Sequence, residues 1–119
     1  MKIRALLPLL ALTVSVAACE NVEGILDELN PSTANVSLQA SSFSPSTVTV
    51  RPGGTVTWTN AGPVQHTITP TNAGQTGAWP AKTMSAQQGA TFTHTFTTAG
   101  TFNYFCTIHS GMTGTVRVE

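Results

Sequence analysis

The chain has 119 residues, with five basic and five acidic side chains and a formal net charge of zero. This length allows one hydrophobic core, and the scarcity of Lys and Arg excludes the dense basic surface that nucleic-acid-binding proteins need. The charges are unevenly distributed, because four of the five acidic residues lie between residues 20 and 28. The charged residues after position 34 are Arg51, Lys82, Arg117 and Glu119. We therefore expect no nucleic-acid partner and no strongly charged surface on the part of the chain that folds.

The first 18 residues have the composition of a signal peptide. A basic start is followed by an apolar stretch, residues 5–18, that is too short to span a bilayer permanently. The sequence Val16-Ala17-Ala18-Cys19 resembles the lipobox of bacterial lipoproteins. It predicts that Cys19 becomes the lipidated N-terminus of the mature protein, anchored in the cell envelope on the periplasmic or another extracytoplasmic face of the membrane. An ordinary signal peptide, cleaved elsewhere, is the alternative.

Residues 19–34 are expected to form the lipidated N-terminus and a tether. Apolar residues recur at helical spacing as far as Pro31, but the segment is too short for a stable isolated helix. It is either a flexible spacer or a short helix that packs against the membrane, the domain or another copy. Fully extended, its fifteen residues after Cys19 would reach roughly 50 Å, so the domain could search for partners while anchored.

From residue 35 to residue 119 the pattern is that of an all-β protein. Short segments alternate apolar and polar residues and are separated by Pro and Gly. The apolar residues of this alternation are Val36, Leu38, Ala40, Val48, Val50, Val56, Trp58, Phe92, Phe96, Phe102, Tyr104, Val116 and Val118. The pattern predicts a single domain, residues 35–119, folded as a Greek-key β-sandwich. Residues 71–90 are expected to form a long connection whose structure the sequence does not indicate.

Four side chains have the donor atoms of a metal site: His66, Cys106, His109 and Met112. The last three lie within seven residues, Cys106-Thr107-Ile108-His109-Ser110-Gly111-Met112, where Gly111 relieves the strain of the turn. One thiolate, two imidazoles and one weakly bound thioether are the ligands of a blue-copper electron-transfer site. Zinc is disfavoured because a thioether is a poor fourth ligand for it. An inert buried cysteine would leave the neighbouring His and Met unexplained.

One cysteine and one histidine lie outside this set, Cys19 and His94. Cys19 and Cys106 are the only cysteines, so a disulfide between them is conceivable by number alone, although each has the separate use described above. His94 shares the strand parity of Phe92 and Phe96 and is therefore expected to point inward. It is predicted to be a partly buried, hydrogen-bonded core histidine rather than a fifth ligand.

Residues 35–119 resemble a small cupredoxin of the plastocyanin, pseudoazurin and amicyanin kind. The resemblance is carried by Asn60, by His66 and by the run Ala99-Gly100-Thr101-Phe102-x-Tyr104-x-Cys106-x-x-His109-x-x-Met112-x-Gly114-x-Val116-x-Val118. The two-residue gap between His109 and Met112 matches the short loop of amicyanin. The resemblance implies one copper ion cycling between Cu(II) and Cu(I), a monomeric domain, and redox partners such as a c-type cytochrome, an oxidase or a reductase.

The resemblance also implies roles for residues around the metal. His109 would be the electron port, surrounded by an apolar patch of Pro63, Val64, Ile108 and either Trp79 or Met84, for which loop packing is an equally good interpretation. Asn60 resembles the Asn that joins the two ligand loops by hydrogen bonds. Thr67 stands where relatives often have Asn. Its backbone N–H is expected to reach the Cys106 sulfur, whereas the sequence leaves open whether its side chain adds support.

Two other classes of function compete with electron transfer. A copper-delivery or storage protein would bind the metal exchangeably through exposed Met or His clusters, whereas this chain embeds one thiolate in a sandwich. A copper enzyme needs a second copper centre or an open coordination site. Residues 35–119 contain one cysteine and no His-x-His pair, so neither a binuclear nor a trinuclear centre can be built from them. We therefore expect an electron carrier that is not an enzyme.

Overall fold

A computed structural model of the chain describes residues 31–119. The predicted signal peptide, the lipidation site at Cys19 and most of the tether lie outside these residues. Within the described part of the chain, no helix has the length and apolar character needed to cross a membrane.

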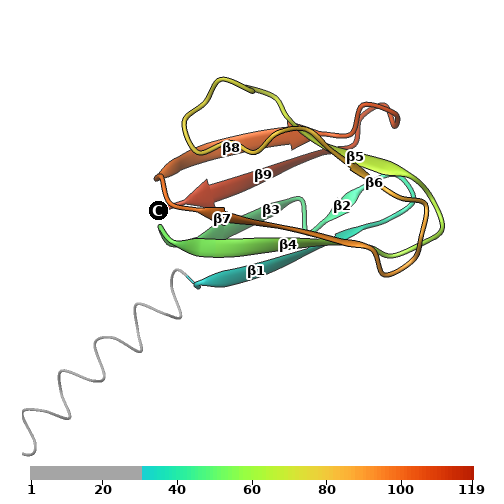
Figure 1. Cartoon of the computed structure of the whole chain (residues 1–119), viewed down its shortest axis with the longest axis horizontal. Helices are drawn as coiled ribbons and strands as arrows, with labels where there is room; N and C mark the ends of the chain where they lie inside the picture. The colour runs from blue at the N-terminus through green and yellow to red at the C-terminus, as the bar shows by residue number, and fades with distance from the viewer. Residues whose placement is uncertain (1–30) are drawn as a thin grey trace, which may run out of the picture.

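The described residues form nine strands in two facing sheets (Figure 1). The strands are β1 (Thr33–Leu38), β2 (Phe43–Ser44), β3 (Thr47–Val50), β4 (Gly54–Asn60), β5 (His66–Pro70), β6 (Lys82–Met84), β7 (Thr91–Phe96), β8 (Gly100–Phe105) and β9 (Thr113–Val118). One sheet has the order β2-β1-β4-β7 and the other the order β3-β9-β8-β5-β6. Parallel pairs, β1 with β4 and β3 with β9, occur among the antiparallel ones. The all-β sandwich predicted from the alternation is confirmed.

The core lies between the sheets and is filled by the alternating apolar residues. Trp58 of β4 contacts Trp79, with ring centroids 5.4 Å apart, and Tyr104 of β8 at 5.6 Å. One expected core position is wrong: Ala40 is exposed. β1 ends at Leu38, and the backbone N–H of Gln39 then donates to the Ser42 carbonyl in a turn, so the alternation stops two residues early.

The long connection between β5 and β7 is held to the sandwich by two side chains. Trp79 is buried, and its indole Nε1–H donates to the Ile68 carbonyl at 3.0 Å. His94 of β7 is half-buried, with Nε2 2.9 Å from the Gly77 carbonyl oxygen. The inward, hydrogen-bonded histidine predicted from parity is therefore confirmed. The connection also contains β6, which the sequence pattern did not indicate.

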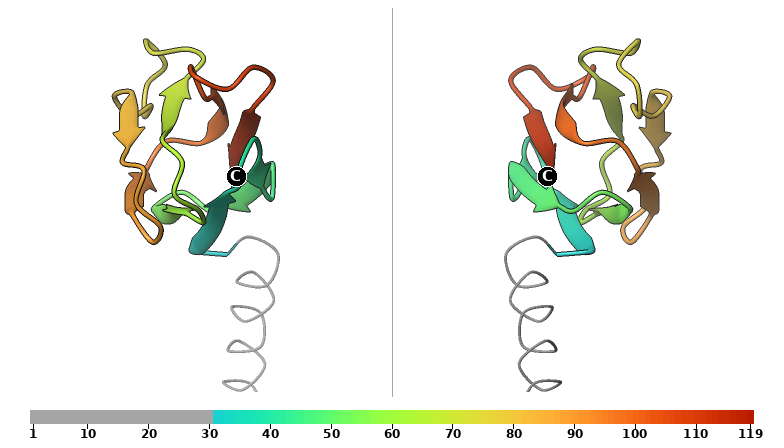
Figure 2. Two further views of the ribbon diagram at one scale, coloured as in Figure 1. Left: turned by 90° about the vertical axis from the view of Figure 1, so that its right-hand side faces the viewer. Right: turned by 90° about the vertical axis from the view of Figure 1, so that its left-hand side faces the viewer.

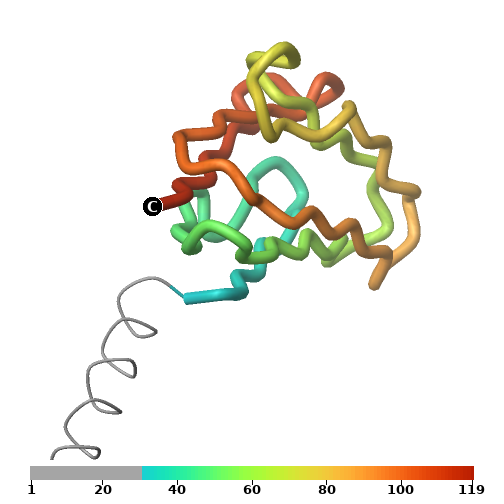
Figure 3. Tube along the Cα trace, turned by 60° about the vertical axis from the view of Figure 1, so that its left-hand side comes forward, coloured from blue at the N-terminus to red at the C-terminus, as the bar shows by residue number. Residues whose placement is uncertain are grey.

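The topology brings the two segments that carry the predicted ligands to one end of the sandwich, which we call the metal end (Figures 1 and 3). Residues 106–112 connect the antiparallel strands β8 and β9, and residues 61–65 connect β4 to β5. The last two residues of β5, Thr69 and Pro70, pair with Phe105 and Tyr104 of the antiparallel strand β8, so the start of β5 extends past the end of β8 towards residues 106–112. The beginning of β1 and the C-terminus of the chain lie at the opposite end.

Candidate metal centre

The Cys106–Met112 loop is closed by its own backbone. The N–H of Cys106 donates to the Met112 carbonyl at 2.9 Å, and the N–H of Met112 donates to the His109 carbonyl at 3.2 Å. Gly111 has a φ of 79°, a left-handed conformation that favours glycine. The turn therefore folds back on itself and directs the side chains of Cys106, His109 and Met112 towards one region.

The fourth predicted ligand, His66, comes from strand β5. His66 is the first residue of β5 and lies opposite Met84 of β6 in the antiparallel pair. Its side chain is 1% exposed, and Met84, at 2%, is equally buried. The pairing with β6 fixes the backbone of His66, and burial restricts its imidazole, so this ligand is largely positioned by the fold itself.

The donor atoms of the site converge. One ligand atom each from His66, Cys106 and His109 lie within 4.8 Å of one another. Nδ1 of His109 is 3.4 Å from the Cys106 sulfur, and the two imidazole rings have centroids 4.8 Å apart. Cys106 and Met112 are buried, at 4% and 1% exposed. The structure thus brings together the three stronger ligands predicted from the sequence, with Met112 buried at the end of the same loop.

One atom of the site specifically fits a metal. Nδ1 of His66 is buried and has no hydrogen-bond partner among the described residues. A buried polar atom without a partner costs free energy, and a metal ion bound at Nδ1 removes that cost. Burial, and secondarily the charge of nearby His109, lowers the pKa of His66 below its usual 6.5. The imidazole is therefore neutral near pH 7, the form that can bind a metal.

Thr67 supports the site more strongly than the sequence suggested. Its backbone N–H points to the Cys106 sulfur at 3.4 Å, as expected. Its hydroxyl oxygen also accepts the backbone N–H of Thr107 at 2.7 Å, and the two threonine hydroxyl oxygens are 3.0 Å apart. The side-chain support that the sequence left open is therefore present.

The joining of the two ligand segments thus depends on Thr67 and Thr107, the residues that immediately follow His66 and Cys106. The role of Thr107 was missed in the sequence. The available signal was the presence of a hydroxyl residue directly after each of these two ligands.

Asn60 organises the segment before His66. Its side chain is fully buried, and its Nδ2 donates to the carbonyls of Val64 at 2.8 Å and Ser85 at 2.9 Å. Its Oδ1 accepts the N–H of Gly62 at 3.3 Å. These bonds fold the β4–β5 loop and attach it to the segment after β6. They differ from the predicted bonds to the Cys106–Met112 loop, because the amide faces Ser85 instead.

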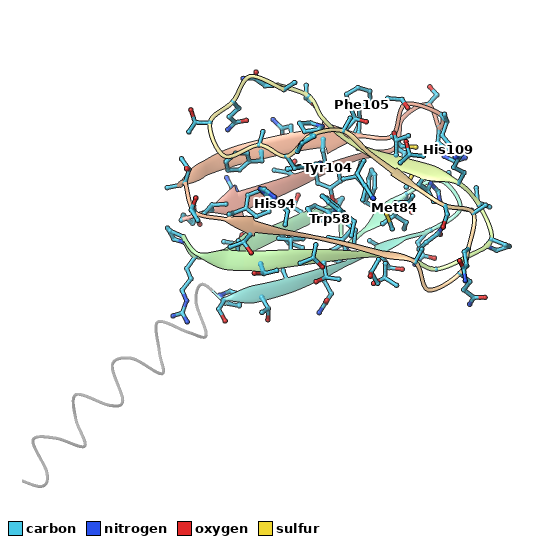
Figure 4. All side chains as sticks on the ribbon, viewed as in Figure 1. Trp58, Met84, His94, Tyr104, Phe105 and His109 are labelled. Atoms are coloured by element: carbon cyan, nitrogen blue, oxygen red, sulfur yellow. The ribbon has the colours of Figure 1, made fainter. Side chains whose placement is uncertain are left out.

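The metal end carries no charged side chain and exposes two large apolar ones. Val64 of the β4–β5 loop is 37% exposed, and Ile108 of the Cys106–Met112 loop is 51% exposed. His109 is half-buried, and Figure 4 shows it at the metal end. The two other residues considered for this patch, Trp79 and Met84, are each 2% exposed, so loop and core packing is the correct interpretation for them. Residues 60–66 and 106–113, which form the metal end, contain no Lys, Arg, Asp or Glu.

We expect Thr67→Val to weaken the metal site while preserving the fold. Valine has a similar shape and keeps the backbone N–H, but it leaves the Thr107 N–H without its acceptor. The loss should lower the free energy of unfolding by about 1 kcal/mol and the copper affinity about tenfold. Chemical denaturation and a competition titration with a chelator measure these quantities. Thr67→Ser is the matched control and should resemble the native protein. Equal affinities for Thr67→Val and the native protein would show that the hydroxyl has no such role.

The comparisons with known proteins agree with this geometry. The family described as copper-binding proteins of the plastocyanin/azurin family matches residues 32–119. A chloroplastic plastocyanin from Tetradesmus obliquus is 36% identical over 117 residues, covering 89% of this chain and 81% of the relative. A plastocyanin from Scenedesmus fuscus is 36% identical over 84 residues, covering 65% of this chain and 86% of the relative.

Solved structures of amicyanin have the same fold. Amicyanin from Paracoccus versutus is 30% identical, with a TM-score of 0.62 over 73% of this chain and 81% of that one. A reduced Cu(I) form of an amicyanin variant at pH 4 is 32% identical, with a TM-score of 0.63 over 73% of this chain and 82% of that one. The protein described here therefore belongs to the plastocyanin/azurin family of copper-binding proteins, and copper is the metal of the site formed by His66, Cys106, His109 and Met112.

Proposed function

We propose that this protein is a membrane-tethered carrier that passes single electrons between redox proteins and catalyses no reaction of its own. The observation that carries the proposal is the ligand set itself: one buried thiolate, two imidazoles and a buried thioether, of which only His109 lies partly at the surface. Copper supplies a one-electron cycle between Cu(II) and Cu(I) at such a site.

The residues of the chain supply rigidity and a contact surface. His66 is buried and paired with Met84 of β6, and the Cys106–Met112 loop is closed by backbone hydrogen bonds. Since the ligands need little rearrangement between oxidation states, each transfer has a low reorganisation cost. The half-buried His109 ring, flanked by exposed Val64 and Ile108, lets a partner approach the metal without displacing a ligand.

The proposed partners are redox proteins with an uncharged or weakly charged docking surface, such as a c-type cytochrome, an oxidase or a reductase. A lipid on Cys19 would hold the protein at the extracytoplasmic side of the membrane. The described chain begins at the end of the sandwich opposite His109 (Figures 1 and 4), so a tether attached there leaves the metal end free to face partners. Confinement near the membrane would raise the local concentration of carrier and partner.

Replacing Cys19 by Ser tests both parts of the proposal. The variant should appear in the soluble fraction with an unaltered visible spectrum, because anchor and metal site share no residue. Purified, it should be reduced and reoxidised repeatedly without losing copper to a Cu(I) chelator, which a delivery protein would not withstand. Cys106→Ala is the control that should stay in the membrane fraction. Retention of Cys19→Ser in the membrane would exclude the lipid anchor, and copper loss during cycling would exclude the carrier.

A further inference from the structure

Strand β7 is the last strand of the four-stranded sheet, so one of its two backbone edges has no neighbouring strand. In the order β2-β1-β4-β7, β7 is bonded only to β4, and Figure 2 shows it at one side of the sandwich. The N–H of Asn60 donates to the Ala90 carbonyl and the N–H of Gly53 to the Phe96 carbonyl. Because backbone direction alternates along a strand, even-numbered residues of β7 face β4. The N–H and C=O groups of Thr91, Thr93 and Thr95 therefore point outward.

The other edge strands are protected in ways that β7 is not. β2, β3 and β6 have two, four and three residues, whereas β7 has six. Pro45 follows β2, Pro52 closely follows β3, and β6 begins with Lys82. Short strands, prolines and lysines are the usual devices that prevent edge-to-edge pairing. β7, with the sequence Thr-Phe-Thr-His-Thr-Phe, contains no proline, glycine, Lys, Arg, Asp or Glu.

The unpaired edge is complementary to itself. Its three outward-facing residues are spaced symmetrically about Thr93, so an antiparallel copy would place Thr91 opposite Thr95 and Thr93 opposite its own equivalent. Each such pair exchanges two backbone hydrogen bonds. On the outer face, exposed threonines would meet threonines. On the inner face, half-buried Phe92 would lie opposite His94, and no like charges within β7 would face each other.

We propose that β7 is a homodimer interface, in which β7 of one copy pairs antiparallel with β7 of a second copy about a twofold axis through Thr93. The two four-stranded sheets would become one continuous sheet. A charged side chain beside β7 is that of Lys82, which lies on β6 in the other sheet. Its Nζ is 6.0 Å from the Phe92 ring centroid. The twofold axis directs the two metal ends in opposite directions, so both remain open to redox partners. This state differs from the monomer that the family resemblance implies.

Sedimentation velocity of the copper-loaded full chain carrying Cys19→Ser tests the interface. We expect a reversible monomer–dimer equilibrium at concentrations up to about 1 mM, since so small an interface belongs to the weak class. Thr93→Pro removes an N–H that points away from β4 and has no strand partner among residues 31–119, at an edge position that tolerates proline. Thr93→Lys places two ammonium groups opposite each other. Each variant should raise the dimer dissociation constant at least about tenfold while keeping the native copper spectrum.

Thr33→Lys is the matched control, because it adds the same charge to the same face of the sheet on β1, away from the edge. Thr33→Lys, which lies away from β7, should leave the dimer dissociation constant unchanged. Amide hydrogen exchange at Thr91, Thr93 and Thr95 should slow as the concentration of the native protein rises. A native protein that stays monomeric throughout this range would overturn the proposal. So would a dimer that persists unchanged in both Thr93 variants, because its interface would then lie elsewhere.

Discussion

Cys106→Ala is expected to abolish the intense visible colour of the oxidised protein. A short Cu(II)–thiolate bond produces strong charge transfer, and Cys106 is the only cysteine among the described residues. The change removes one small sulfur atom at the edge of the core, so the sandwich should stay folded. Visible absorption and circular dichroism of the copper-loaded variant measure the two expectations separately.

Two comparisons make this result specific. His94→Gln changes a histidine that bonds to Gly77 and contacts Trp79 and Phe96, so it should leave the colour unchanged. Cys19→Ser should also keep the colour. Strong absorption that survives in Cys106→Ala would mean that another residue supplies the dominant ligand, and the assignment of the site would be wrong.

Ile108→Asp is expected to slow electron exchange between copies of the protein at least about tenfold, the scale of a central interface residue. Self-exchange between Cu(I) and Cu(II) forms requires two metal ends to meet, and Ile108 is the more exposed of the two large apolar side chains there. The substitution places a charge on each of the two facing surfaces. NMR line broadening in mixtures of the two oxidation states gives the rate.

The rate of self-exchange, measured at different ionic strengths, also tests whether charged side chains steer the contact between two copies. In the native protein the rate should depend only weakly on ionic strength, because the metal end has no charged side chain to create a field. Lys82→Gln and Arg117→Gln are the control variants and should change the rate little. If these two variants slow exchange more than Ile108→Asp does, or if the native rate changes steeply with salt, contact between proteins depends on a charged face instead.

The fold and the ligands could be predicted because each leaves a local pattern. A strand buried on one face alternates, as Val56 and Trp58 show, and the three ligands of one loop are close in sequence because they are close in space. His66 was identifiable because its chemistry matches theirs. Ala40 was misjudged because alternation does not reveal where a strand ends; the turn at Gln39 depends on a backbone hydrogen bond.

The remaining features depend on contacts between distant segments. The hydroxyl of Thr67 acquires its role only when β5 lies beside β8. Trp79 is buried against Trp58 and Tyr104, with its indole N–H satisfied by the Ile68 carbonyl. Neither pairing leaves a periodic trace in the sequence. The open edge of β7 is of the same kind, since an edge is defined by the absence of a neighbouring strand in the finished sheet.

The placement of His109 at a single end of the sandwich also constrains how fast the protein can work. Donor and acceptor would both contact the surface around Val64 and Ile108, so they cannot be bound at the same time. The cycle is then of the ping-pong type, and each partner acts as a competitive inhibitor of the other. A complex with a long lifetime would stall the carrier, since one partner must leave before the next arrives. Brief, weak encounters therefore give higher throughput than tight ones.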